Sequence, residues 1–422
     1  VKEEGSAVGT SGGITAIDFV GDGVTASGSG ANATVTIPGF GPDGQENLYA
    51  GSDAGANSDA DTCFNIALGY ESGKFLNAGD RNIYLGCEAG KCNTAGDQNI
   101  AIGDRAGKCA QGGCNITMGV QAGYNFSTGS ANIAIGMNAM SSDVVTGSSN
   151  VAIGRCAGRN ISSGASNFFG GYCAGELSTC AKCNVFIGHA AGTCRQSGCY
   201  NIAFGTWALR GTSTPTNNSG ANNIALGLDA GAKVKTGADN IALGQLALGG
   251  ADVSGNKNVA IGCQAGNSVT SATSNVFLGN STGANVVTGG CNVFLGAYAG
   301  QGSASQTTGS TNNIAIGLMA GRCMSDNSYF NIVMGEAAGQ YMTSGDRNII
   351  MGRKAAQGVL TGNRNIFLGQ YAGCTMTSGS CNIALGCGAL NDVCGVTDTI
   401  AIGRLSLIHI SEPTRQAEIS YA

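Results

Sequence analysis

The chain has 422 residues, of which 72 are glycine, 11% are charged and 6% are aromatic, and its formal net charge is −5. Such a glycine-rich, charge-poor composition is unusual for globular domains, while 42% hydrophobic residues exclude a solvated, disordered coil. No basic run offers a surface for nucleic acid, and no apolar run approaches the roughly 20 residues that span a bilayer. The sequence therefore predicts a folded, repetitive protein with no nucleic-acid partner and no membrane insertion.

Residues 1–46 contain no repeat but hold two strand-like runs, ITAIDFV at 14–20 and ATVTI at 33–37, joined by turns rich in glycine, aspartate and serine. This segment predicts a small β module that adapts the chain to the repeats. No secretion signal precedes it. Because the sequence begins at Val1 rather than at methionine, however, we expect a fragment of a longer protein.

From residue 47 to residue 404 a short pattern of Asn, three mostly apolar residues and Gly returns 21 times, with Thr399 in place of Asn in the last copy, as in NIALG from Asn65 and NVFLG from Asn275. Thirteen of the 20 intervals are 17 residues, and the two longest are 22 and 21 residues. When each copy is numbered from its first residue, position 5 is always glycine, position 8 is usually alanine and position 9 is usually glycine. This pattern, followed by a half rich in Ser, Thr, Gly and Asn, is typical of a short strand and turns.

Seventeen residues are too few for a separate core, so the copies are expected to stack into an all-β, repetitive β-solenoid of about 21 coils. At about 4.8 Å per stacked strand, this is a rod on the order of 100 Å long. The repeated asparagines are expected to bond to one another along the stack. A sugar- or ion-binding role is disfavoured, because a residue used in twenty copies serves the architecture. The structural residues singled out are Asn65, Asn82, Asn99, Asn132, Asn201, Asn275 and Asn382 at position 1, and Gly69, Gly86, Gly103, Gly136, Gly205, Gly279 and Gly386 at position 5.

Positions 2 and 4 are large and apolar almost throughout, and because they share one face of the strand we expect them to point inward. Position 3 would then point outward, yet it is also apolar, as at Phe186, Phe277 and Phe294. A strand that is apolar on both faces is buried on both faces. No remaining segment is long enough to cover the rod, so we expect other copies of the same chain. A parallel homotrimer is the favoured assembly and a dimer is the alternative.

The 18 cysteines follow the repeat, which indicates a structural role. They can be small apolar fillers, or pairs such as Cys109 and Cys114 can close a disulfide across a turn. Their spacings form no four-ligand zinc set, so no metal is expected. Four cysteines share position 11 and four others immediately precede the next asparagine: Cys92, Cys109, Cys194 and Cys323, then Cys114, Cys183, Cys291 and Cys381.

Residues that could carry catalysis are sparse. His189, the only histidine before the tail, follows a glycine turn, which favours an exposed turn residue. The GDRN segments at 79–82 and 345–348 fall just before strands, where Asx turns or caps explain them. No phosphate-loop motif and no acidic cluster is present. The 22-residue coil holds an insertion around Pro215 that is expected to bulge from the rod. The sequence predicts no enzyme, no catalytic residue and no cofactor.

The repeat stops inside its last copy, and the string LSLIHISEPTRQAEISYA from Leu405 to Ala422 keeps neither the Ala-Gly pair nor the spacing. It resembles the translation of sequencing-adapter read-through. We therefore treat residues 405–422 as a non-native tail.

The N-terminal segment and the NIAIGxxAG-type repeats, which cover about 85% of the chain, resemble tail-fibre and other virion structural proteins of marine bacteriophages. This resemblance implies a trimeric fibre on the virion that contacts other virion or tail proteins and helps the particle reach a host surface. A host-surface receptor would be bound by parts outside this chain. A more distant resemblance, to the head repeats of trimeric autotransporter adhesins, implies a bacterial cell-surface adhesin instead. A solenoid enzyme acting on polysaccharide is the third and least favoured alternative.

Overall fold

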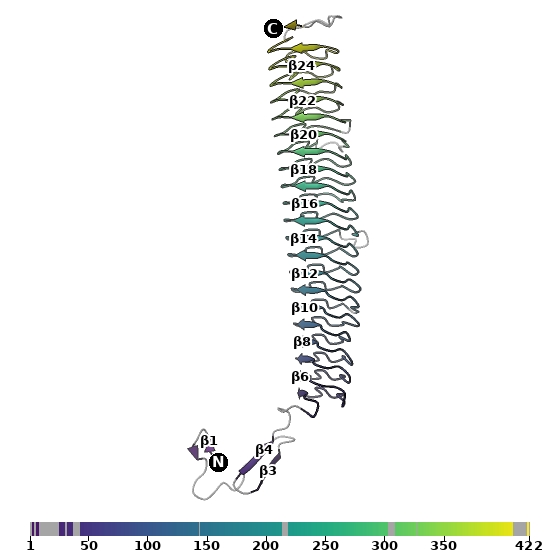
Figure 1. The fold of residues 1–422 in the computed structure, drawn as a ribbon, viewed down its shortest axis with the longest axis vertical. Coiled ribbons are helices and arrows are strands. Elements are labelled where there is room, and N and C mark those ends of the chain that lie inside the picture. The colour runs from purple at the N-terminus through teal and green to yellow at the C-terminus, as the bar shows by residue number, and fades with distance from the viewer. Residues whose placement is uncertain are drawn as a thin grey trace.

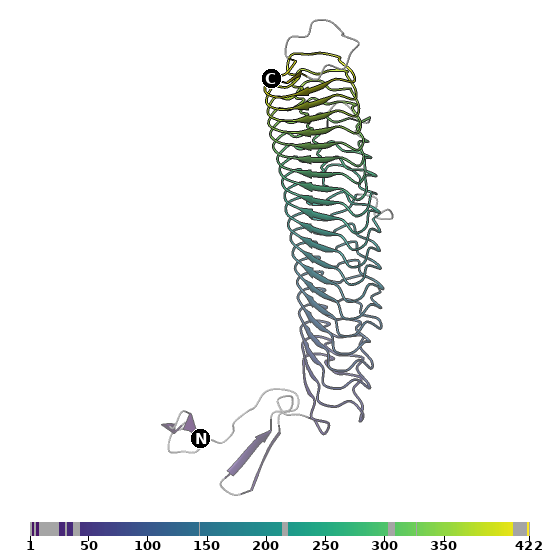
Figure 2. The same cartoon turned by 45° about the horizontal axis from the view of Figure 1, so that its top comes forward.

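The computed structural model describes residues 43–407 except 143, 213–217, 303–308 and 326, together with the backbone of five short strands outside that range. Within this part of the chain the structure is an all-β, parallel β-solenoid without helices, so the predicted fold class is confirmed. Figure 1 shows the coils stacked in one long column. Figure 2 shows the strands aligned in one row, with the loops on the other side of the rod.

Twenty-one strands of three residues, one in each coil, form a single parallel ladder. Each strand pairs with the next at equivalent positions, as Phe277 does with Phe294. In chain order the strands are β5 (Leu48–Ala50), β6 (Ile66–Leu68), β7 (Ile83–Leu85), β8 (Ile100–Ile102), β9 (Ile116–Met118), β10 (Ile133–Ile135), β11 (Val151–Ile153), β12 (Phe168–Gly170), β13 (Val185–Ile187), β14 (Ile202–Phe204), β15 (Ile224–Leu226), β16 (Ile241–Leu243), β17 (Val259–Ile261), β18 (Val276–Leu278), β19 (Val293–Leu295), β20 (Ile314–Ile316), β21 (Ile332–Met334), β22 (Ile349–Met351), β23 (Ile366–Leu368), β24 (Ile383–Leu385) and β25 (Ile400–Ile402).

Five further strands lie outside the ladder or at its end. β1 (Lys2–Glu3) pairs antiparallel with β2 (Ser6–Ala7), and β3 (Thr25–Ser29) pairs antiparallel with β4 (Asn32–Thr36). The run predicted at 33–37 overlaps β4, whereas the run at 14–20 lies outside the described residues. In the tail, β26 (Ser420–Tyr421) pairs parallel with β25. Because this tail is expected to be foreign, no function is assigned to that pairing.

The predicted orientation of the strand residues was wrong. Position 3, expected outside, points into the solenoid and is buried in every coil but the first, for example at Ala67 and Phe186. Positions 2 and 4, expected inside, line the outer face and are partly or largely exposed, as in β6 and β18. The position-1 asparagine explains the difference, because its amide is buried within the coil. Side chains alternate along a strand, so position 3 also points inward and positions 2 and 4 point outward.

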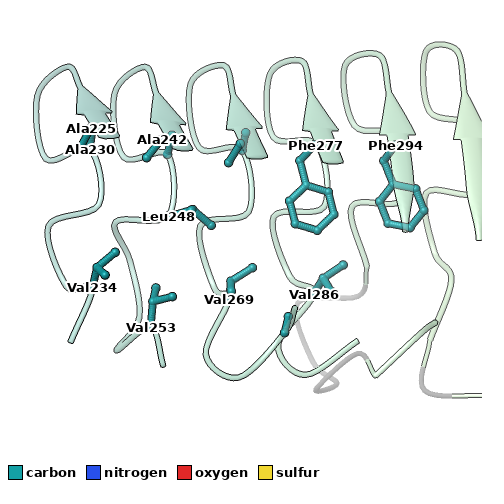
Figure 3. Close-up of a cluster of buried hydrophobic side chains, with 14 of the residues drawn as sticks. Ala225, Ala230, Val234, Ala242, Leu248, Val253, Val269, Phe277, Val286 and Phe294 are labelled. Atoms are coloured by element: carbon teal, nitrogen blue, oxygen red, sulfur yellow. The ribbon is translucent and has the colours of Figure 1, made fainter. Parts of the chain in front are cut away.

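The space inside a coil is shared between positions 3 and 9. Wherever position 3 is Phe or Tyr, position 9 is glycine. At Gly283 an added Cβ would lie 2.5 Å from the Phe277 ring, so only glycine fits beside that aromatic side chain. Where position 3 is alanine, position 9 can be large, as with Ala242 and Leu248 in Figure 3. The two positions therefore exchange volume and keep the interior close-packed.

The loop side of the coil supplies the opposite wall of the core. Position 12 is buried and apolar in most coils, as at Val234, Val269 and Val286, which face the strand in Figure 3. The buried side chains form one cluster from Ala110 to Ala401 and a smaller one from Ala67 to Ala106. Because the coils stack on one another, this core is a narrow column along the axis of the rod.

Candidate interaction surface

A column of buried asparagines joins each coil to the next. All twenty position-1 asparagines are buried. In mid-rod, Asn275 Nδ2 donates to Asn258 Oδ1 at 3.0 Å and to the Gly289 carbonyl of its own coil at 2.9 Å. Its Oδ1 accepts the backbone N–H of Asn292 at 3.0 Å. One amide thus closes its own coil and bonds to both neighbouring coils. The asparagines singled out from the sequence all lie in this column: Asn65, Asn82, Asn99, Asn132, Asn201, Asn275 and Asn382.

The position-5 glycines form a second column directly after the strands. Their φ angles lie between +119° and +139°, a region that L side chains rarely adopt. At Gly279 an added Cβ would also lie 2.7 Å from the backbone carbonyl of Gly296 in the next coil. Glycine is therefore required both by the turn and by the close stacking. The glycines singled out from the sequence all lie here: Gly69, Gly86, Gly103, Gly136, Gly205, Gly279 and Gly386.

These two columns hold positions 2 and 4 of β5–β25 on the outer face, and we name these 42 positions the outer stripe. Every side chain in the outer stripe is apolar, apart from a single glycine. Twelve of them are at least 36% exposed, and most of the others are partly exposed. The twelve are Leu68, Met118, Ile153, Val185, Ile202, Phe204, Leu226, Leu278, Ile314, Met351, Ile400 and Ile402.

One strand of the outer stripe shows a compensation of volume between positions 2 and 4. Its one glycine, Gly170, shares β12 with Phe168, the one aromatic residue at position 2. A Cβ added at Gly170 would lie 3.1 Å from the Phe168 ring, so the ring occupies the space that a position-4 side chain would fill.

The sequence contained a signal for this orientation that the prediction did not use. Position 3 varies from alanine to phenylalanine, whereas positions 2 and 4 are almost all Ile, Val, Leu or Met. An enclosed position can vary in size when position 9 compensates for it. Positions 2 and 4 keep nearly the same side-chain size along most of the rod. Uniform size therefore marks the outer stripe, and compensated variation marks the interior.

The aspartates of the GDRN segments link neighbouring coils. Asp80 Oδ1 accepts the backbone N–H of Cys63 at 2.8 Å, one coil earlier. The Asp80 N–H in turn donates to Asp97 Oδ1 at 2.9 Å. Asp346 accepts the N–H of Tyr329 at 2.9 Å in the same way. These hydrogen bonds run between coils, so the expected Asx turn or cap within one coil does not describe them.

All 18 cysteines are free thiols in the structure. Burial raises the pKa of Cys109 to about 12 and that of Cys173 to about 11, so both thiols stay protonated near neutral pH. His189 is exposed at the position after the glycine column, where the sequence placed it. Its imidazole stacks on Tyr172 with ring centroids 5.2 Å apart. The insertion around Pro215 lies largely outside the described residues.

Charged side chains pair along the first coils of the rod. Glu71 bonds to Lys74 at 2.7 Å and to Lys91, and Glu88 bonds to Lys91 and Lys108 at 2.8 Å. The hydrogen bonds from Lys108 and Lys91 lower the pKa of Glu88 to about 2. This network links three successive coils on the outside of the rod and sits apart from the outer stripe.

Among the described residues, no group of three or more His, Cys, Asp or Glu side chains is arranged to hold a metal ion. The same part of the chain contains no helix with the length and hydropathy of a membrane span. Neither a known family model nor a curated protein matches the sequence. The functional proposal therefore rests on the geometry of the rod.

Proposed function

We propose that this chain is the shaft of a homotrimeric fibre, in which three parallel copies pack their outer stripes around a common axis. The observation that carries the proposal is the outer stripe itself. A sheet face left in water carries polar side chains, whereas no polar side chain occurs at the 42 positions of the outer stripe. Three strand faces of equal length and equal rise can pack against one another in a closed ring.

The size of the outer stripe fits such an assembly. Twenty-one strands at about 4.8 Å, with two side chains about 7 Å apart across each strand, give on the order of 700 Å² per copy. This area exceeds most apolar patches on monomers, which reach roughly 300–600 Å². It also approaches the roughly 800 Å² that each partner buries in a standard interface.

A trimeric rod of this kind suits a tail fibre or a related virion appendage that contributes to attachment at a host surface. Two features support this role: the extended, stacked architecture and the resemblance of the repeats to phage fibre shafts. Other virion proteins would join the ends of the shaft, and a receptor-binding part would lie outside it. No catalysis is proposed for the shaft.

The test places charge in the outer stripe. In the double variant Leu278→Lys/Leu295→Lys, six lysines would meet at two adjacent levels of the trimer axis, so we expect monomers by light scattering. The control Val359→Lys changes a residue that is 53% exposed in a loop, and this variant should stay trimeric. Electron microscopy should show rods on the order of 100 Å long for the wild type. Trimers in both variants would overturn the proposed interface.

A further inference from the structure

The middle of the rod is electropositive although the chain as a whole is acidic. Between Asp143 and Asp229 the sequence holds five Lys or Arg residues and a single acidic residue, Glu176, which pairs with Arg159 at 3.4 Å. Arg195 is buried in the core, and the other four cations are at least partly exposed. The net charge of the whole chain is −5, so this segment differs in sign from the rest. A local excess of positive charge on an acidic protein attracts anions to that place.

In the same segment three aromatic rings from successive coils stack along the rod. Tyr172 and His189 are 5.2 Å apart between centroids with an interplanar angle of 5°, and Trp207 meets His189 edge-on at 6.0 Å. A guanidinium closes each end of the stack. Arg155 lies 5.7 Å from the Tyr172 ring centre and Arg210 lies 5.6 Å from that of Trp207. We name these five residues the aromatic column.

The aromatic column is on the surface and beside the outer stripe rather than in it. Its rings belong to positions 6 and 7, just past the glycine column, and Tyr172 is 45% exposed and Trp207 36% exposed. Elsewhere in the described chain an exposed ring contacts a cation without such a stack, as Phe330 does with Arg347 at 5.6 Å. A trimer that covers positions 2 and 4 leaves this flank available.

The two arginines of the aromatic column have no acidic partner among the described residues. Other cations on the rod do have acidic partners, because Lys74, Lys91 and Lys108 in the first coils each form an ion pair with a glutamate. The guanidinium groups of Arg155 and Arg210 can instead donate several hydrogen bonds each to a carboxylate or a sulfate.

We propose that the aromatic column binds an acidic polysaccharide, carboxylated or sulfated, that lies along the rod. The column extends over four coils, on the order of 14 Å between the outer levels, which is the length of a short oligosaccharide. The two guanidinium groups hold anionic groups of the glycan. Between them, the Tyr172 hydroxyl, the His189 imidazole and the Trp207 N–H present polar edges to hydroxyl groups, while the ring surfaces contact apolar sugar faces.

The experiment measures binding of the full chain to immobilised polygalacturonate, dextran sulfate and neutral dextran. We expect binding to at least one acidic polymer at low ionic strength, weakening as salt rises, and no binding to neutral dextran. The two acidic polymers distinguish a carboxylate from a sulfate ligand. No binding to either, or equal binding to neutral dextran, would overturn the proposal.

The variants locate the site. The double variant Arg155→Gln/Arg210→Gln should bind at least about tenfold more weakly than the wild type, and Trp207→Ala should also lose affinity. The matched control Arg322→Gln/Arg347→Gln removes two charges from similar cation–ring contacts elsewhere on the rod, and should bind within about twofold of the wild type. Thermal unfolding confirms that each variant is folded. An equal loss of affinity in both double variants would show that binding comes from diffuse charge attraction, which would contradict the site. Tighter binding of oligothymidylate than of either polysaccharide would contradict the proposed ligand.

Discussion

The strand half of each coil, positions 1–9, differs from the loop half that follows it in how much variation it contains. The strand half has the same length in all copies and carries the asparagine column, the glycine column and the buried position 3. The loop half absorbs every change in repeat length, from 16 to 22 residues. Both halves nevertheless bond to the next coil through their backbones: the Val276 N–H donates to Asn292 in the strand half, and the Thr146 N–H donates to Ser162 in the loop half.

This difference shows which interactions set the stacking. Coils stack in register when their buried side chains and their close backbone contacts recur at equivalent positions in successive coils. The strand half supplies both. The loop half of a coil buries two residues, as Val269 and Ala272 in the coil of Asn258, and its other residues are at least partly exposed, so added residues can project outward. Substitutions in the strand half should therefore cost more than equivalent ones in the loop half.

The largest expected effect comes from removing a buried ring. Phe277→Ala leaves a cavity in the core and should destabilise the surrounding coils by about 3–5 kcal/mol. Val359→Ala, at an exposed loop residue, should change stability by less than about 0.5 kcal/mol. Because a stacked array can open locally, the measurement is hydrogen exchange of the amides in β18 and β19.

A second substitution sharpens this test. In the double variant Phe277→Ala/Gly283→Leu, the new leucine should refill part of the cavity, as Leu248 does beside Ala242. Part of the lost protection should return. If the double variant exchanges as fast as Phe277→Ala alone, positions 3 and 9 do not share the interior volume.

A smaller loss is expected from the asparagine column. Asn275→Ala removes an amide that bonds to Asn258, Asn292 and the Gly289 carbonyl. Each buried polar group left without a partner costs about 1–3 kcal/mol. The control is Asn391→Ala in the loop half, where the side chain contacts the neighbouring Asp392 at 3.3 Å. Equal thermal unfolding midpoints for the two variants would contradict a special role of the column.

Two glycines at position 9 provide a closely matched pair. Gly283 and Gly231 have φ angles of +58° and +57°, so replacement by alanine strains both backbones equally. The new Cβ would lie 2.5 Å from the Phe277 ring in one case and 2.9 Å from the flexible Leu209 side chain in the other. Gly283→Ala should therefore be less stable than Gly231→Ala by about 1–3 kcal/mol, measured by chemical denaturation. The opposite order would refute the steric account.

The smallest effect is expected from the outer ion pairs. The pKa of Glu88 is lowered to about 2, so the stability that its ion pairs contribute is fully present above the unfolded pKa of about 4.3. That stability is lost as the pH falls towards 2. Glu88→Gln should lower the free energy of unfolding at pH 7 by less than about 1 kcal/mol. This appears as a slightly lower unfolding midpoint. The difference from the wild type should shrink below pH 4 and in high salt. A difference that grows on acidification would contradict the assigned pKa direction.

The repeat predicted the fold because its spacing gives the coil length, the strand and the glycine turn without knowledge of long-range contacts. Alternation could not decide which face is inside, since both faces of the strand are apolar. The buried amide of Asn275 decides it, and that role depends on the carbonyl of Gly289, which lies 14 residues further along the chain. The stacking of Tyr172, His189 and Trp207 was equally hidden, because it depends on residues at positions 6 and 7 of successive coils meeting in space.

The central claim is that the outer stripe is covered by other copies of the chain. Sedimentation equilibrium of the full chain at several concentrations tests it directly, because it reports the mass of the assembly in solution. We predict a single species with three times the chain mass of 41.8 kDa that does not dissociate on dilution. A folded monomer at all concentrations would leave the 42 positions of the outer stripe in water and would contradict the account.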